Sequence, residues 1–151
     1  MVYLTRRYRF SAAHRLHNDS LTSEENKRLY GKCDNEFGHG HNYVLEVTVA
    51  GKVDPQTGMV LDLIVLDSAV EREVIERFDL SNLNFDVERF RSIVPTTENV
   101  CIEIFRLLRD RLAAENAKNV RLDRVRLEET PSNFFEYFGD GGPWPARREV
   151  R

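Results

Sequence analysis

The chain contains only four histidines, and three of them are spaced so that they can hold one metal ion. In Gly38-His39-Gly40-His41, two histidines stand two positions apart, so on an extended backbone both side chains point to the same side. The glycines remove side-chain bulk around them. His14 lies at the end of a predicted strand, and it can supply a third ligand if that strand pairs with the one that follows His41.

Three histidines leave one coordination position of a zinc ion open. This is the pattern of catalytic zinc, whereas structural zinc sites are closed by four protein ligands. Imidazole also suits copper, nickel and iron, so the pattern favours zinc without excluding these metals. The alternative is that the GHGH segment is a flexible loop and that His14 is an ordinary surface residue. We predict that the fourth histidine, His17, is solvated, or at best contacts a metal ligand from outside.

Two alternating segments predict the strands that would position these histidines. Residues 2–10 carry apolar side chains at even positions, and residues 42–50 alternate cleanly. Between them, residues 17–32 are polar and predict a long loop, with a helical turn over Ser23–Leu29. Val53–Gly58 then predicts a turn, because it contains proline and glycine at positions that favour one.

Two amphipathic helices are predicted after the second strand. The first begins at Asp62, which is suited to an N-cap, and is followed by the loop Phe78–Asp86. The second begins near Pro95–Glu98, with Thr96 or Thr97 as its N-cap. Apolar residues recur at helical spacing in both, at Leu66, Val70, Val74 and Phe78 in the first and at Val100, Cys101, Ile104, Phe105, Leu108 and Leu112 in the second.

Two more strands complete an α+β domain. Residues 120–128 alternate with a slip in phase at Asp123–Arg124, and residues 134–138 predict a last strand. This order of elements predicts a four-stranded antiparallel sheet with both helices on one face. We assign residues 1–138 to this domain and residues 139–151 to a C-terminal tail, whose tryptophan, Trp144, we expect to pack on its own domain or on a neighbour.

Composition excludes several classes of protein. The 151 residues fit one domain, and a hydrophobic content of 41% is enough for a core. No apolar run approaches the ~20 residues of a membrane span, and the N-terminus has no signal-peptide pattern. A net charge of −3 gives no basic footprint for nucleic acid. Cys33 in a polar loop and Cys101 in a helical pattern favour a reduced, cytoplasmic protein without a disulfide.

Ordered motifs over about residues 4–130 resemble the 6-pyruvoyl tetrahydropterin synthase family, which includes the 6-carboxytetrahydropterin synthase of the queuosine pathway. The motifs are Phe10-Ser11-Ala12-Ala13-His14-Arg15-Leu16, Tyr30-Gly31-Lys32-Cys33, Gly38-His39-Gly40-His41-Asn42-Tyr43, Asp54-Pro55 with Thr57-Gly58-Met59-Val60, Thr96-Thr97-Glu98-Asn99-Val100 and Glu129-Thr130. The resemblance implies a T-fold, or tunnelling fold, whose subunits assemble into a barrel. It also implies a homo-hexamer, a dimer of trimers, with active sites between subunits.

The resemblance further implies a carbon–oxygen lyase that acts on 7,8-dihydroneopterin triphosphate. The reaction releases triphosphate and redistributes hydrogens along the side chain, which needs a Lewis acid, a base and an anchor for the pterin ring. His14, His39 and His41 match the family's zinc ligands. Cys33 matches its catalytic cysteine, which acts as a thiolate base, and Glu129 matches the residue that anchors the pterin.

Four further positions match the family's site, and one departs from it. Thr96 and Thr97 match residues that line the pterin pocket, with Glu98 beside them. Asp79 matches the aspartate of an Asp-His pair that forms the family's second proton-handling unit. The histidine position of that pair is Leu80, and leucine cannot transfer a proton.

Each of these residues also has a simpler explanation. Cys33 could be a spare loop thiol, and Glu129 could be an exposed charge at a strand end. Thr96 and Thr97 could simply cap the second helix. Cys101 lies on the apolar stripe of that helix and is predicted to belong to the core.

Three functions remain open from the sequence. The spacing between Cys33 and His39 resembles the 6-pyruvoyl branch of the family, so a 6-pyruvoyl tetrahydropterin synthase is favoured over a 6-carboxy-5,6,7,8-tetrahydropterin synthase. The same scaffold could instead cleave the side chain of a dihydroneopterin. The third function is pterin binding by a protein that has lost catalysis, which Leu80 would explain.

Overall fold

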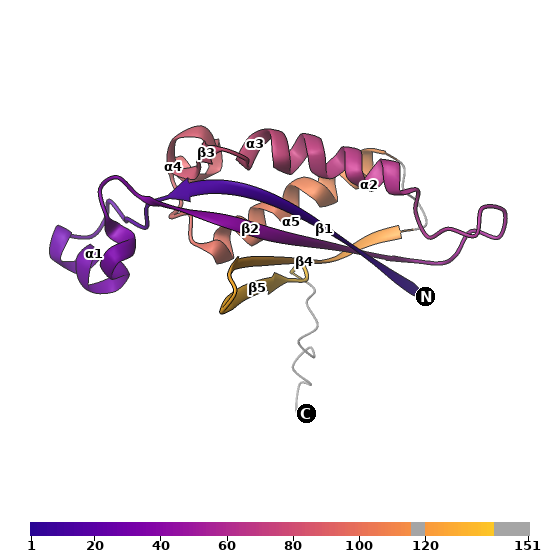
Figure 1. Cartoon of the computed structure of the whole chain (residues 1–151), viewed down its shortest axis with the longest axis horizontal. Helices are drawn as coiled ribbons and strands as arrows, with labels where there is room; N and C mark the ends of the chain where they lie inside the picture. The colour runs from indigo at the N-terminus through magenta and orange to yellow at the C-terminus, as the bar shows by residue number, and fades with distance from the viewer. Residues whose placement is uncertain (116–119, 141–151) are drawn as a thin grey trace, which may run out of the picture.

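The computed structural model describes residues 1–115 and 120–140, which form one sheet covered on one face by helices (Figure 1). The strands are β1 (Val2–His14), β2 (His39–Gly51), β3 (Ser81–Asn82), β4 (Val120–Thr130) and β5 (Asn133–Tyr137). Their order across the sheet is β3-β1-β2-β4-β5. The α+β class is confirmed. The predicted count of four strands is wrong, because β3 adds a short fifth strand that runs parallel to β1.

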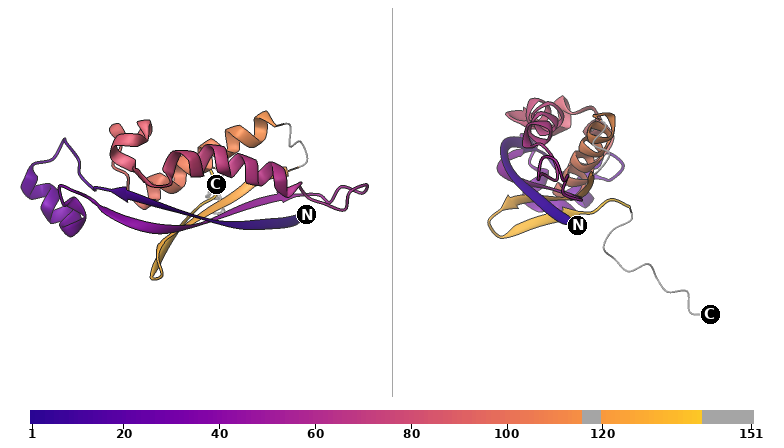
Figure 2. Two further views of the ribbon diagram at one scale, coloured as in Figure 1. Left: turned by 45° about the horizontal axis from the view of Figure 1, so that its top comes forward. Right: turned by 90° about the vertical axis from the view of Figure 1, so that its right-hand side faces the viewer.

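Two long helices cover the same face of the sheet, as predicted (Figure 2). One is a continuous helix built from α2 (Leu63–Val70), the π-helical turn η2 (Glu71–Ile75) and α3 (Glu76–Phe78), and the other is α5 (Thr97–Ala114). The remaining helical segments are α1 (Ser23–Tyr30), α4 (Leu83–Asp86) and the short 3₁₀ turns η1 (Gly31–Asp34) and η3 (Glu88–Arg91). Among the described residues, no helix is long and apolar enough to cross a membrane.

The β1–β2 ladder is longer than the sequence pattern predicted. Both strands have 13 residues, and their pairing runs from Val2 opposite Gly51 to His14 opposite His39. The predicted strands stopped short because alanine, serine and glycine near these ends have little β-propensity of their own. Pairing along the ladder carries both strands onward, so the histidines lie on regular strand and the flexible-loop alternative for them is wrong.

The slip in phase that we predicted at Asp123–Arg124 is a β-bulge in β4. Thr48 on β2 pairs with Arg124, but the next residue on β2, Val49, pairs with Leu122, so Asp123 has no partner in the ladder. The extra residue lets apolar side chains before and after it face the same core. Val125, which follows the bulge, is fully buried.

The π-helical turn keeps the first long helix aligned with the core. Its buried residues Leu66, Val70, Val74 and Phe78 recur at every fourth position. Residues four apart drift by about 40° around an α-helix, so a regular helix would rotate this stripe away from the sheet. A π turn accommodates an extra residue and offsets the drift, which explains its position in the middle of the helix.

The segment predicted as the loop Phe78–Asp86 contains β3 and α4, so that prediction is wrong in part. It docks on the outer edge of β1 through backbone contacts. The Leu80 amide donates to the Ser11 carbonyl at 2.6 Å, and the Asp79 carboxylate accepts from the Ser11 amide at 2.7 Å. Leu80 adopts a positive φ of 54°. These contacts join residues distant in sequence, so local pattern gave no sign of them.

Residues 141–151 of the predicted tail, including Trp144, lie outside the described residues.

The core lies between the helices and the sheet, where Phe10 stacks on Tyr43 with ring centroids 5.0 Å apart and meets Phe78 edge-on at 6.0 Å. Cys101 is buried in this core, as predicted.

Two isoleucines on α5 allow a matched test of this packing. Ile104 is fully buried, whereas Ile102 on the same helix is 41% exposed. We expect Ile104→Ala to lower the free energy of unfolding by about 2–5 kcal/mol, because it removes buried methyl groups and leaves a cavity. Ile102→Ala should change it by less than about 0.5 kcal/mol. Urea denaturation monitored by circular dichroism measures both, and equal losses would contradict this packing.

Candidate metal centre and active site

The three histidines singled out from the sequence lie together at one end of the β1–β2 ladder. His14 pairs with His39 across the ladder, and His41 lies two residues further along the same face of β2. Ring centroids are 4.6 Å apart for His14 and His39, 4.8 Å for His39 and His41, and 5.2 Å for His14 and His41. One ligand nitrogen from each ring can be chosen so that all three lie within 4.8 Å of one another.

Gly38 allows this close approach of the two strands. It has a positive φ of 70°, and a Cβ atom added to it would lie 2.8 Å from the carbonyl oxygen of His14. Only glycine therefore fits where the chain enters β2. Gly40 is different, because an added Cβ would meet only the Ala12 carbonyl at an ordinary 3.6 Å. The expected need for small residues around the histidines thus holds for Gly38 alone.

A backbone carbonyl fixes the tautomer of His14. The ring is 1% exposed, and its Nδ1 lies 2.8 Å from the carbonyl oxygen of Pro95, at the start of α5. A carbonyl can only accept, so Nδ1 carries the proton and Nε2 keeps its lone pair. Burial lowers the pKa of His14 to about 4. The ring is therefore neutral near pH 7, with Nε2 free to bind a cation.

The other two rings have nitrogens suited to a cation. Nε2 of His39 lies 3.1 Å from Nε2 of His14, and burial lowers the pKa of His39. Two buried ring atoms, Nδ1 of His39 and Nε2 of His41, have no hydrogen-bond partner among the described residues. An unpartnered buried polar atom costs about 1–3 kcal/mol, which a bound ion can offset. Three imidazole donors fit zinc or another borderline divalent metal.

Glu129 at the end of β4 approaches the histidines from the next strand. Its Oε1 lies 3.6 Å from Nε2 of His41 and 3.8 Å from Nε2 of His14. The Thr97 hydroxyl donates to Oε1, and the Asn133 side-chain amide donates to Oε2 at 2.8 Å.

Glu129 is held as a carboxylate. Burial favours its neutral form, but the hydrogen bonds from Thr97 and Asn133 outweigh burial and leave its pKa below the ordinary value. The side chain is 17% exposed, so Glu129 is not an exposed charge at a strand end. An ionised carboxylate thus borders the histidine cluster.

The two threonines before α5 have different roles in the structure. Thr96 is the N-cap, as predicted, and its side chain accepts from the Asn99 amide at 3.4 Å. Thr97 is buried and bonds Glu129 instead of capping the helix. Glu98 is exposed in the first turn of α5.

The structure does not add Cys33 or Asp79 to the converging histidine donors. Cys33 lies in η1, where it is partly buried, and its carbonyl accepts from the Leu16 amide at 2.9 Å. The Asp79 carboxylate is bonded to the Ser11 amide at the edge of β1. Both cysteines are free thiols, as predicted.

Sequence reasoning missed two contributors to the site. The Pro95 carbonyl is a backbone atom, which has no signature in sequence, and Asn133 reaches Glu129 only because a turn joins β4 to β5. His17, which we predicted to be solvated or at best in contact with a metal ligand from outside, is only partly solvated. Its side chain is 24% exposed, and its Nδ1 lies 2.7 Å from an oxygen of Asp34. The three-residue distance from His14 gave no sign of this partner.

Comparison with known proteins places this chain in one family. Residues 3–140 match the family described as 6-pyruvoyl tetrahydropterin synthase. A 6-pyruvoyl tetrahydrobiopterin synthase of Drosophila melanogaster is 43% identical over 145 residues, which is 96% of this chain and 82% of the relative. The chain belongs to the 6-pyruvoyl tetrahydropterin synthase family.

A solved structure and a more distant relative add to this placement. The 6-pyruvoyl tetrahydropterin synthase of Caenorhabditis elegans aligns with a TM-score of 0.85 and 46% identity, covering 91% of this chain and 95% of that one. A 6-carboxy-5,6,7,8-tetrahydropterin synthase of Rickettsia felis is 28% identical over 151 residues, covering 90% of this chain and 99% of the relative. The resemblance stated from the motifs is confirmed at the level of the family.

The two cysteines should react very differently. Cys101 is 2% exposed, and burial raises the pKa of its thiol to about 12. We expect iodoacetamide at pH 8 to alkylate Cys33 in the native protein and to reach Cys101 only after denaturation, because the thiolate is the reactive form. Mass spectrometry of tryptic peptides measures both. Labelling of Cys101 as fast as Cys33 in the native protein would contradict the burial described.

Proposed function

We propose that this chain is a zinc-dependent carbon–oxygen lyase of the 6-pyruvoyl tetrahydropterin synthase type, acting on 7,8-dihydroneopterin triphosphate. The observation that carries the proposal is the meeting of three histidine donors with the ionised carboxylate of Glu129 in one place. Membership of the family and the names of the similar proteins support the same activity.

In this proposal His14, His39 and His41 hold the zinc. When bound, zinc supplies a Lewis acid for the hydroxyl groups of the substrate side chain. The chain prepares this site in advance, since the Pro95 carbonyl keeps Nδ1 of His14 protonated and directs Nε2 toward the other rings.

Glu129 anchors the pterin ring. A carboxylate accepts two hydrogen bonds from neighbouring N–H groups such as those on the amino-pyrimidinone edge of a pterin, and such charge-assisted bonds are strong. Thr97 and Asn133 occupy one lone pair on each carboxylate oxygen, so acceptor capacity remains on both. They also fix the orientation of the carboxylate. Thr96 and Glu98 flank Thr97 in sequence, and we assign them to the same pocket.

Cys33 acts as the thiolate base that removes a proton from carbon, and Asp79 assists proton transfer.

The identity of the product remains a choice between the family's branches. The greater identity to proteins named 6-pyruvoyl tetrahydrobiopterin synthase supports the pyruvoyl product over the carboxy product. Leu80, whose side chain is 87% exposed and apolar, favours a second candidate, a pterin-binding protein without catalysis.

The open edges of the sheet support assembly into a barrel of several copies. β3 covers β1 only at Ala12 and Ala13, so the rest of the outer edge of β1 is unpaired within the described chain, and β5 forms the opposite edge. Exposed edges of this kind pair with other strands. We propose a homo-hexamer with active sites between subunits.

The two free thiols fit a reducing compartment such as the cytoplasm.

Metal content and turnover test the proposal together. We expect about one zinc per chain by inductively coupled plasma mass spectrometry, because three imidazoles converge at the proposed metal site. His39→Ala should lose the metal, while His17→Asn, outside the cluster, should keep it.

With zinc and 7,8-dihydroneopterin triphosphate, mass spectrometry should detect a 6-pyruvoyl product and free triphosphate. A 6-carboxy product would support the 6-carboxytetrahydropterin synthase branch of the family. Tight pterin binding without triphosphate release would contradict the proposal that the protein is an enzyme.

Glu129→Gln should weaken pterin binding. Glutamine removes the negative charge while keeping the shape, and a hydrogen bond to a charged group contributes about 1.5–3 kcal/mol, or about 10- to 150-fold in affinity. Isothermal titration with a non-reacting pterin measures the loss. Glu128→Gln is the matched control, because Glu128 is the neighbouring residue on β4 and contacts Arg126 instead. A similar loss in both variants would contradict the role given to Glu129.

A further inference from the structure

We propose that His17, oriented by Asp34, is an acid–base catalytic residue of this site. The inference rests on the proposed lyase function. That reaction takes a proton from one carbon and delivers a proton to another, and an imidazole can do both beside Cys33 and Asp79. Three of the four histidines converge on the metal position, and His17 is the one that remains.

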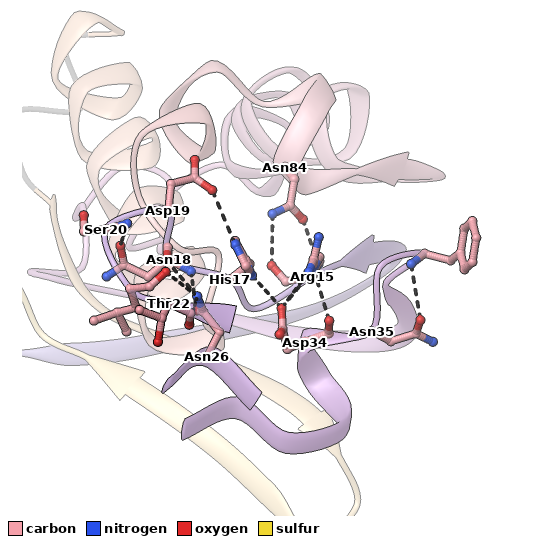
Figure 3. Close-up of polar contacts among 12 residues, drawn as sticks. Arg15, His17, Asn18, Asp19, Ser20, Thr22, Asn26, Asp34, Asn35 and Asn84 are labelled. Atoms are coloured by element: carbon pink, nitrogen blue, oxygen red, sulfur yellow. Dashed lines mark hydrogen bonds and ion pairs between the residues drawn. The ribbon is translucent and has the colours of Figure 1, made fainter. Parts of the chain in front are cut away.

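Asp34 orients the His17 ring as a base (Figure 3). Nδ1 of His17 lies 2.7 Å from Oδ1 of Asp34, and a carboxylate can only accept, so Nδ1 carries the proton. Nε2 then keeps its lone pair. A base held by a carboxylate in this way is a recurring arrangement for proton transfer.

Charged side chains lie around His17. The His17 hydrogen bond, followed by Arg15, holds the pKa of Asp34 below its ordinary value, so Asp34 stays ionised. Nε2 of His17 lies 3.6 Å from an oxygen of Asp19, which is almost fully exposed. Arg15 lies 2.9 Å from Asp34 and shares its charge. Two carboxylates and one guanidinium thus surround the ring.

The His17 segment is fastened to the Cys33 segment along its length. The Leu16 amide donates to the Cys33 carbonyl at 2.9 Å, between the contacts that Arg15 and His17 make to Asp34. Asn84 holds the Arg15 backbone from α4, with bonds of 2.8 Å from its amide and 2.9 Å to its carbonyl. His17 is therefore fixed beside the segment that contains the proposed base.

A cavity of about 670 Å³ is lined by His17 and by two residues next to the metal ligands. Its walls include His17, Gly38, Pro95 and Asn82. Gly38 directly precedes His39, and the Pro95 carbonyl accepts from His14. Asn82 lies two residues after Leu80. A cavity of this size accommodates a small molecule. A ligand in this cavity would lie against His17.

The step assigned to His17 is the elimination of triphosphate. Nε2 takes the proton from the carbon next to the one that bears the phosphate ester. The electron pair of that C–H bond becomes the second bond of an enol, and the C–O bond breaks with its electron pair leaving on triphosphate. The imidazolium returns the proton to the terminal carbon. The enol hydroxyl loses its proton to water and becomes a ketone, so no oxidant or reductant is needed.

Two variants separate catalysis from support of the loop. His17→Asn places an amide N–H where Nδ1 was, so it can still donate to Asp34 but cannot carry a proton between atoms. His17→Ala removes both functions and leaves space for free imidazole. Each variant is compared with wild type in zinc content, thermal melting, kcat and KM, using triphosphate release from 7,8-dihydroneopterin triphosphate as the assay.

Loss of an acid–base group lowers the rate by about 10²- to 10⁴-fold. We expect His17→Asn to lower kcat at least 10²-fold with zinc content and KM near wild type, and we expect added imidazole to restore part of the kcat of His17→Ala. Activity of His17→Asn near that of wild type would overturn this inference alone and assign His17 to loop support. No triphosphate release by zinc-loaded wild type would overturn the proposed function itself, and the role of His17 with it.

Discussion

In the β1–β2 ladder, His14 lies opposite His39, and every other contact of the site follows from that register. A shift by one residue would turn His39 and His41 to the opposite face of the sheet. Gly38 allows the register, because any larger residue would collide with the His14 carbonyl. The hydrogen bond from His14 to Pro95 then ties the same point to the start of α5. One backbone pairing thus positions groups from β1, β2 and α5.

Charge and burial are balanced around this point. His14 and His39 are kept neutral by burial, and Glu129 is kept ionised by Thr97 and Asn133. Hydrogen bonds within the protein therefore set both protonation states before any ligand arrives. Such preorganisation reduces the free energy that a ligand must supply to arrange the site.

Much of the fold could be predicted from sequence, because alternation and helical spacing report which side chains face a core. The Asp62 and Thr96 N-caps and the bulge at Asp123 were visible in the pattern for the same reason. The ends of the long strands and the docking of Leu80 depend on pairing between distant segments. The partner of His17 was hidden for a similar reason, since Asp34 lies 17 residues away in a segment that is polar throughout.

The short distance between Glu129 and two of the histidines has a consequence for ligand binding. A divalent ion held by the histidines and a pterin held by the carboxylate would feel the same charge, at separations where Coulomb interactions in a partly buried site are strong. The two binding equilibria are then thermodynamically linked. Linkage is reciprocal, so whatever factor the metal imposes on pterin affinity, the pterin imposes on metal affinity. Retention of the ion would therefore depend on how much pterin surrounds the protein.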